Sequence, residues 1–246
     1  MRREGFLMSS DFSDLSRRLT AALRLRAAPV AIRFTATPAT EPRVESTAPP
    51  ANEAGRTGAV PAGCVFWVKA TERTFATGAA DHANCSVGSL THGWITLEEA
   101  AMRDDVAAVL EAGWVDPAAV GSLSRVADRP VAIVYGPLAE ASEAPDVVLV
   151  RLDGLGLMTL HGAVPDLRIE GRPQCHVVPI AKEAGAVAAS VGCALSRART
   201  GMRADEMTAT IPGPRLADVV AAIEATATLD RAMASYAAKD AKRFRA

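Results

Sequence analysis

The sequence predicts an α+β protein, with a mixed sheet flanked by helices. Residues 11–26, 97–113 and 214–226 carry apolar side chains at intervals of three and four, the pattern of amphipathic helices. Residues 130–135 and 146–151 are nearly continuous apolar runs, the pattern of strands that are covered on both faces. Together the two kinds of segment favour the α+β class.

Composition limits the classes of protein that the chain can represent. Its 246 residues are enough for a sizeable core, and 49% of them are hydrophobic, so we expect one globular domain over residues 1–246. The net charge of −1 and the 4% of aromatic residues give no case for binding nucleic acid or an anionic membrane surface. A homo-oligomer stays open.

The same reasoning predicts a cytoplasmic location. Residues 1–10 lack the apolar run of a signal peptide, and no stretch reaches the ~20 apolar residues of a membrane span. In the cytoplasm, the four cysteines are expected to be ligands or catalysts rather than disulfides.

In chain order, the first helix is capped by Asp11 or Ser13 and is followed by a short strand at 29–34. Residues 35–62 have no periodicity and are expected to form a long irregular loop. The 97–113 helix opens on a Thr96 cap signature and ends at a glycine, and the 214–226 helix has proline in its first turn. The remaining expected helices are 64–71, 85–90, 117–126, 154–162, 175–183 and 229–243, and the remaining strands are 73–78, 166–170, 186–191 and 206–211.

One stretch concentrates metal-binding side-chain types. Residues 81–93 read DHANCSVGSLTHG and hold one thiol and two imidazoles, in a chain with only four Cys and four His. His82 is a candidate proton donor or metal ligand oriented by Asp81. Helix capping by Asp81 and packing of His82 is an equally simple interpretation.

The other cysteines lie in comparable settings. Cys64, Cys85, Cys175 and Cys193 each follow a turn or strand end and precede a segment of helical character. The start of a helix favours the thiolate, which suits a metal ligand or a nucleophile. The alternative is that they are small buried apolar residues.

The four thiols predict a 4Fe-4S cluster as the cofactor, assembled from distant segments. Zinc is the alternative, disfavoured because paired Cys-x-x-Cys motifs are absent. If all are ligands, at least Cys64, Cys85 and Cys193 should line one pocket with His82 at its rim. Arg197, four residues after Cys193, is a candidate clamp for a carboxylate or phosphate; a surface ion pair is its simpler role.

The cysteines also suggest an internal repeat. A cysteine, a helix, a strand and a second cysteine occur at Cys64 to Cys85 and again at Cys175 to Cys193, and Ser-Val-Gly recurs near Cys85 and Cys193. Two pseudo-repeated halves sharing one site would explain this, and chance in an Ala- and Val-rich chain would explain it equally.

At these motifs the chain resembles domain-of-unknown-function family 169, from residue 15 to about residue 225. The specific motifs are DHANCSVG at 81–88 and SVGC at 190–193, the latter with Arg197. The resemblance implies the fold family and a cysteine at all four positions, and it implies no activity. His176, beside Cys175, falls outside the family pattern.

Three functions follow as expectations. The first is a cysteine-ligated metal protein, with an iron–sulfur centre acting in redox or Lewis-acid chemistry on a small molecule or with a redox partner. The second is a metal-free thiol enzyme with Cys85 as nucleophile and His82 as base. The third is a non-catalytic ligand-binding or sensor module.

Overall fold

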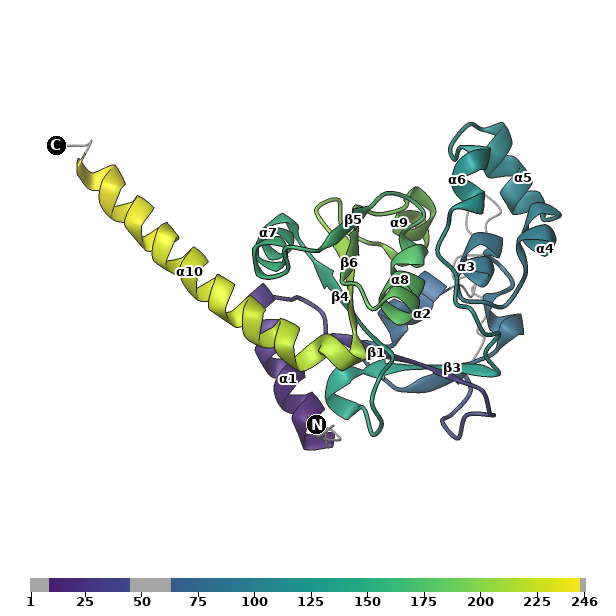
Figure 1. Cartoon of the computed structure of the whole chain (residues 1–246), viewed down its shortest axis with the longest axis horizontal. Helices are drawn as coiled ribbons and strands as arrows, with labels where there is room; N and C mark the ends of the chain where they lie inside the picture. The colour runs from purple at the N-terminus through teal and green to yellow at the C-terminus, as the bar shows by residue number, and fades with distance from the viewer. Residues whose placement is uncertain (1–8, 45–62, 244–246) are drawn as a thin grey trace.

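The computed structural model describes residues 9–44 and 63–243 and places seven strands in one mixed sheet (Figure 1). The strands are β1 (Val30–Thr35), β2 (Phe75–Thr77), β3 (Ala132–Pro137), β4 (Val147–Leu152), β5 (Arg168–Glu170), β6 (Ala188–Ser190) and β7 (Met207–Pro212). Their order is β2-β3-β1-β4-β7-β6-β5, and β5 pairs with β6 in parallel while the other neighbours are antiparallel. The predicted α+β class with a mixed sheet is confirmed.

Helices surround this sheet. They are α1 (Ser9–Leu23), α2 (Gly63–Lys69), α3 (Ser86–Thr91), α4 (Leu97–Ala101), α5 (Asp104–Glu111), α6 (Pro117–Gly121), α7 (Gly154–Ala163), α8 (Val177–Ala184), α9 (Ala194–Thr200) and α10 (Leu216–Arg243). Four short 3₁₀ turns join them: η1 (Ala79–His82), η2 (Leu138–Glu140), η3 (Gln174–His176) and η4 (Gly213–Arg215).

The central strand β4 shows why the sheet is covered on both faces. Val148, Val150 and Leu152 pack into a core with residues of α1, α7 and α10. Val147 and Leu149 point the other way, into a core with residues of α2 and α8. Successive side chains of a strand alternate between faces, so a strand with apolar side chains on both faces needs two helix layers.

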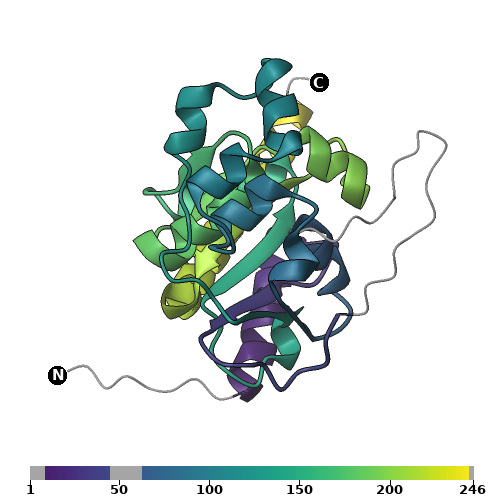
Figure 2. The same ribbon diagram turned by 90° about the vertical axis from the view of Figure 1, so that its right-hand side faces the viewer.

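The second face of the sheet carries the region of interest. Here α2, α3, α8 and α9 lie together, with contacts between α2 and both α3 and α9. Helices α3–α6 stand in front of the sheet when the molecule is viewed from that side (Figure 2). Three of the four cysteines belong to or begin these helices, and the fourth lies in η3, directly before α8.

The prediction of one helix over 97–113 is wrong, because the structure has two helices there, α4 and α5. Its capping box is present, since the Thr96 hydroxyl accepts from the Glu99 amide and the Glu99 carboxylate accepts from the Thr96 amide. Arg103 is extended (φ −94°, ψ 137°), and a new helix begins at Asp104. Two aspartates favour a helix N-terminus, where the dipole is positive.

The two helices expected over 214–226 and 229–243 are instead one continuous helix, α10. No glycine or proline lies between Thr226 and Leu229 to end it. Pro179 does not interrupt α8, because it lies in the first turn, where a missing amide is tolerated. Other element ends shift by a few residues, most of all α6, which ends at Gly121.

Two expectations stay open. Residues 45–62 of the loop expected over 35–62 lie outside the described residues. Strands β2 and β6 each stand two places from the central β1–β4 pair, but this position alone does not establish a repeat, and two pseudo-repeated halves stay a prediction.

Within residues 9–44 and 63–243, no helix has the length and apolar content needed to cross a membrane.

Gly213, after β7, provides a test of the fold. Its amide donates to the carbonyl of Asp146 at 2.8 Å, and a Cβ at this position would lie 1.8 Å from the carbonyl oxygen of Pro145. Gly213→Ala should therefore lower the free energy of unfolding by about 1–3 kcal/mol, because backbone must move. Urea denaturation measures this. Gly154→Ala is the control, since its Cβ would meet nothing within 4 Å. Equal stability of the two variants would contradict this packing.

Candidate functional site

All four cysteines line one cavity, of about 50 Å³. They come from four separate segments of the chain: Cys64 from α2, Cys175 from η3, Cys85 from the residue before α3, and Cys193 from the residue before α9. None is in a disulfide, and three of them are partly exposed while Cys175 is buried. The cavity thus joins Cys175 to the three cysteines expected to meet.

Local backbone geometry directs two of these thiols. Cys85 (φ −145°, ψ 96°) and Cys193 (φ −140°, ψ 131°) are both extended residues immediately before a helix. Neither side chain caps its helix, so neither sulfur is tied to the backbone of the first turn. Each of these extended residues therefore leaves its thiol available to the cavity.

The rest of the cavity wall is largely apolar. Helices α5 and α6 and the segments beside them contribute most of it, and the lining side chains there are Val106, Val109, Trp114, Val115, Val120 and Leu123. Arg172 stacks on Trp114, with its guanidinium carbon 4.9 Å from the ring centroid. This contact joins the segment before Cys175 to the helical wall.

Burial and mutual repulsion raise the pKa of two of the thiols, Cys64 and Cys175. Burial raises the pKa of Cys64 to about 11, the charges of Cys85 and Cys193 add to the rise, and a hydrogen bond from Ser196 and the charge of Arg199 oppose it. For Cys175, burial comes first and the charges of the other three cysteines also raise the pKa well above its ordinary value. Thiolates in this cavity need a cation.

Arg199 is the one cation among the described residues that line the cavity. Its guanidinium is hydrogen-bonded to Cys85 and donates to the carbonyl of Asn84 at 3.4 Å. Burial lowers the pKa of Arg199, but the charges of Cys85, Cys64 and Cys193 raise it by more. Sequence reasoning did not single out this residue.

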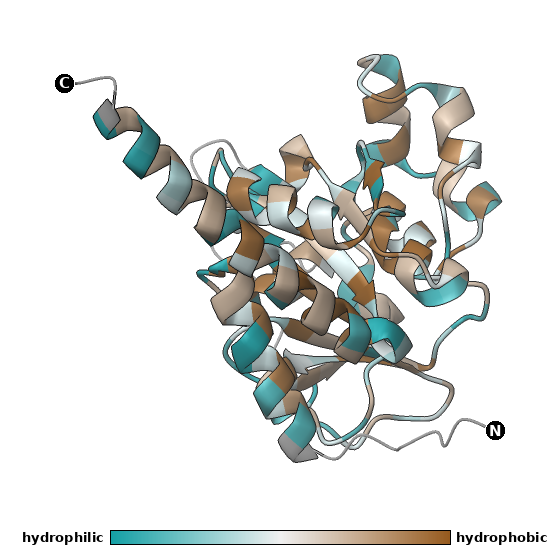
Figure 3. Ribbon diagram, turned by 60° about the vertical axis from the view of Figure 1, so that its left-hand side comes forward, coloured by the Kyte–Doolittle hydropathy of each residue, from teal (hydrophilic) through white to brown (hydrophobic). Residues whose placement is uncertain are grey.

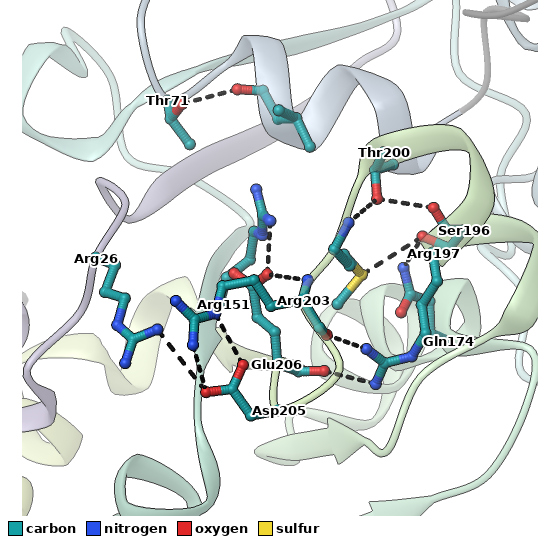
Figure 4. Close-up of polar contacts among 12 residues, drawn as sticks. Arg26, Thr71, Arg151, Gln174, Ser196, Arg197, Thr200, Arg203, Asp205 and Glu206 are labelled. Atoms are coloured by element: carbon teal, nitrogen blue, oxygen red, sulfur yellow. Dashed lines mark hydrogen bonds and ion pairs between the residues drawn. The ribbon is translucent and has the colours of Figure 1, made fainter.

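Arg197 does not line the cavity. Its guanidinium donates to the carbonyls of Val191 at 3.1 Å and Glu206 at 2.7 Å, and also to that of Arg203, so it ties together the chain on either side of α9 (Figure 4). A Cβ on Gly192, whose φ is +118°, would lie 2.8 Å from this guanidinium. The contacts of Arg197 are thus with its own loop rather than with the space between the thiols.

Arg197 was expected at the site because it lies four residues after Cys193. Such spacing places two side chains on one face of a helix only when both residues are helical. Cys193 is an extended residue outside α9, so the spacing from Cys193 does not apply. The sequence offered no signal that Cys193 precedes the first helical residue rather than occupying it.

His82 is not at the rim of the cavity, which corrects the expectation. It is 1% exposed, and its ring packs against Phe66, Trp94 and Tyr135, with centroids 4.9, 5.5 and 6.3 Å away. Its Nε2 lies 3.1 Å from the Thr77 hydroxyl. That hydroxyl donates to the carbonyl of Ile133, so Nε2 of His82 is the donor and Nδ1 is unprotonated.

His92 lies beside His82, with ring centroids 5.5 Å apart. Its Nδ1 is 2.8 Å from the carbonyl of Gly88, so Nδ1 carries the proton and Nε2 does not. A Cβ on Gly63 would lie 3.4 Å from Nε2 of His92 and 3.8 Å from Nδ1 of His82. Because Gly63 lines the cavity, the two imidazoles lie directly behind its wall.

Two buried polar groups complete the cavity. Gln174 donates through Nε2 to the Ser196 hydroxyl, and Ser196 contacts the sulfur of Met202 at 3.7 Å (Figure 4). Oε1 of Gln174 has no partner among the described residues. The last residue of η3, His176, has its Nε2 3.7 Å from a carboxylate oxygen of Glu170 and is not among the residues that line the cavity.

The described residues hold no group of three or more His, Cys, Asp or Glu side chains placed to bind a metal ion. Thiols are ligands of a metal-binding type, but within this part of the chain they are not arranged as a ready-made site for an ion. Four-coordinate zinc needs bonds of about 2.0–2.3 Å to every ligand.

The buried imidazoles predict how stability depends on pH. Burial lowers the pKa of His92 to about 4 and that of His82 well below its ordinary value of 6.5. Below 6.5 the unfolded chain binds protons that the folded chain does not, so the free energy of unfolding falls as the pH falls. We expect a loss of about 1 kcal/mol per imidazole over the first pH unit below 6.5.

Urea denaturation above and below pH 6.5 measures this slope. His92→Gln should reduce it, and His161→Gln should leave it unchanged, because His161 is exposed. A stability that does not change over this range would contradict burial of two neutral imidazoles.

Comparison with known proteins gives a family. The family model DUF169, described as "Uncharacterised ArCR", matches residues 18–222, a span that includes all four cysteines, His82, His92 and Arg199. No curated protein and no solved structure matches the chain. Since the match covers most of the chain, this protein belongs to the DUF169 family.

Proposed function

We propose that this protein is a cysteine-ligated metal protein with a 4Fe-4S cluster, acting in redox or Lewis-acid chemistry on a small molecule or with a redox partner. The observation that carries the proposal is the meeting of Cys64, Cys85, Cys175 and Cys193 at one cavity. These are all the cysteines in the chain, and they are separated by up to 129 positions in the sequence. The absence of a disulfide among these four cysteines also favours a reducing compartment, and hence a cytoplasmic location.

Electrostatics supports a cationic occupant. Burial and neighbouring charges raise the pKa of Cys64 and Cys175, so an empty site would keep these thiols protonated at neutral pH. Iron offsets the repulsion between thiolates directly, and binding releases the thiol protons. The single guanidinium of Arg199 supplies one positive charge among four sulfurs.

The spacing of the cysteines in the sequence favours a cluster over zinc. Structural zinc sites of four cysteines usually come as paired Cys-x-x-Cys motifs, which this chain lacks. A cluster places its own iron and sulfide atoms between the cysteines, so its ligands stand around a cavity rather than around a point. When bound, the cluster would supply one-electron transfer or a Lewis-acidic iron.

The protein itself would set the environment of that cluster. The valines and Trp114 of the α5–α6 wall exclude water, and Arg199 donates a hydrogen bond to the Cys85 sulfur. Charge and hydrogen bonds at the sulfurs are known determinants of cluster potential. The imidazoles of His82 and His92 remain neutral behind Gly63 and bring no charge to the site.

The test is anaerobic purification or reconstitution followed by iron and sulfide analysis. We expect brown protein with about four irons and four sulfides per chain. Each single Cys→Ser variant of Cys64, Cys85, Cys175 or Cys193 should lose or destabilise the cluster, because each removes one thiolate. Leu195→Ala is the matched control, since Leu195 lines the same cavity without a thiol.

Two results would overturn the cluster. Colourless protein without iron after reconstitution is one, provided that circular dichroism shows a folded chain. Protein with one tightly held zinc per chain is the other, because it would assign the thiols to a mononuclear site.

A metal-free thiol enzyme is the second candidate, and the contact between Arg199 and Cys85 favours it. A guanidinium beside a thiol stabilises the thiolate, which is the nucleophile. In this version Arg199 activates Cys85 in place of His82, whose Nε2 is engaged by Thr77. A ligand-binding or sensor module remains the third class, and it would retain binding in a Cys85→Ser variant.

Alkylation of the metal-free protein tests the thiol enzyme. Iodoacetamide at neutral pH should modify Cys85 first, and Arg199→Gln should slow that reaction about tenfold if the guanidinium lowers the barrier by roughly 1.4 kcal/mol. Arg203→Gln is the control, because Arg203 is exposed and pairs with Asp205. Mass spectrometry measures each site. Equal rates at all four cysteines would argue against a nucleophile at Cys85.

A further inference from the structure

Two unprotonated imidazole nitrogens face one point inside the protein, beside the Cα of Gly63. A Cβ on Gly63 would lie 3.4 Å from Nε2 of His92 and 3.8 Å from Nδ1 of His82. Neither nitrogen has a hydrogen-bond partner among the described residues. The two side chains are 0% and 1% exposed, so bulk water does not reach them. Two buried lone pairs therefore converge where a donor is needed.

The two rings cannot relieve this by turning over. Nε2 of His82 already donates to the Thr77 hydroxyl at 3.1 Å, and Nδ1 of His92 already donates to the Gly88 carbonyl at 2.8 Å. A flipped ring would exchange one unpaired nitrogen for another. Hydrophobic residues predominate in the strands at the centre of the fold (Figure 3). In such an interior an unpaired polar atom loses its hydration without compensation.

Unpaired hydrogen-bond donors surround the same two imidazoles. The ring of Trp67 lies 6.4 Å from that of His92, and the rings of Trp94 and Tyr135 lie 5.5 and 6.3 Å from that of His82, measured between centroids. The indole Nε1 atoms of both tryptophans and the phenol oxygen of Tyr135 are buried and have no partner among the described residues. This part of the core thus presents unpaired acceptors and unpaired donors together.

The mixture of donors and acceptors selects the class of ligand. A metal cation would engage the two imidazole nitrogens but would be repelled by the indole N–H groups, and two imidazoles are fewer ligands than zinc requires. An anion would pair with the N–H groups and be repelled by the lone pairs. Water donates two hydrogen bonds and accepts two, so it suits both kinds of group, and buried waters typically have two to four such partners.

We propose that one water molecule lies against the Cα of Gly63 and bridges Nδ1 of His82 and Nε2 of His92, donating a hydrogen bond to each. Its two lone pairs are left for donor side chains around it. A side chain at position 63 would occupy the same point, so glycine is what leaves room for the water. This binding site is separate from the metal centre proposed above and does not depend on it.

The bridging water would join segments that border two of the cysteines. Gly63 begins α2 and is followed directly by Cys64. The carbonyl of His82 accepts from the amide of Cys85 at 3.2 Å, and His92 is the residue that ends α3. The site thereby links the backbone that presents Cys64 to the backbone that presents Cys85, without contact between the water and a thiol.

A crystal structure of the full chain, prepared with a chelator and with anomalous data recorded, tests the site directly. We expect one density peak within about 2.7–3.2 Å of both nitrogens and without anomalous signal. Gly63→Ala should lose the peak, because its methyl group takes that point. Gly88→Ala is the matched control, since Gly88 lines the same cavity and its Cβ would meet only Cys85, at 3.4 Å from the sulfur. The peak should remain in that variant.

Solution NMR of the full chain with ¹⁵N-labelled histidine gives a second measurement. We expect the proton on Nε2 of His82 and on Nδ1 of His92, with both remaining nitrogens at the lower shifts of hydrogen-bond acceptors. In Gly63→Ala these two unprotonated nitrogens should move by several ppm toward the shift of a free acceptor, and in Gly88→Ala they should not. Circular dichroism verifies that both variants are folded.

Three outcomes would overturn the proposal. The first is a wild-type crystal in which both imidazoles are well ordered and no peak lies between them. The second is a peak with anomalous signal and bonds of about 2.0–2.1 Å to the nitrogens, because the ligand would then be a metal ion. The third is a water peak, or a pair of acceptor shifts, that is the same in wild type and in Gly63→Ala.

Discussion

The electrostatic cost of placing four thiols around one small cavity governs the candidate site. Cys64 and Cys175 are held protonated by burial and by the charges of their neighbours, and Arg199 offsets only part of that repulsion. Buried groups of like charge are stable only when they are neutral or when a cation joins them. The empty cavity therefore favours protonated thiols at Cys64 and Cys175, and the metal centre proposed above would stabilise the deprotonated ones.

The sheet makes this convergence possible. Strands β2 and β6 lie on opposite sides of the central β1–β4 pair, and the chain leaves each of them toward a helix that begins just after a cysteine. Cys64 and Cys175 come from the helical segments that precede those strands. The fold thus brings the four thiols to one side of the sheet through its connections, while α1, α7 and the start of α10 complete the core on the other side.

Much of this arrangement was readable from residue patterns. Apolar runs at 130–135 and 146–151 indicated strands buried on both faces, and four cysteines, each after a turn or strand end and before a segment of helical character, suggested a shared site. The position of His82 was not readable, because it depends on packing against aromatic rings from distant parts of the chain. The role of Arg199 rather than Arg197 was not readable either, because it depends on where α9 begins relative to Cys193. The break at Arg103 and the unbroken α10 depend on packing that a local pattern does not record.

The central claim is that all four cysteines hold one metal centre together. The most direct measurement is site-resolved alkylation, by mass spectrometry, of the same protein before and after anaerobic reconstitution with iron and sulfide. The account predicts that Cys64, Cys85, Cys175 and Cys193 become protected together, in proportion to the iron bound. Iron uptake that leaves two or more of these cysteines as reactive as before would contradict it.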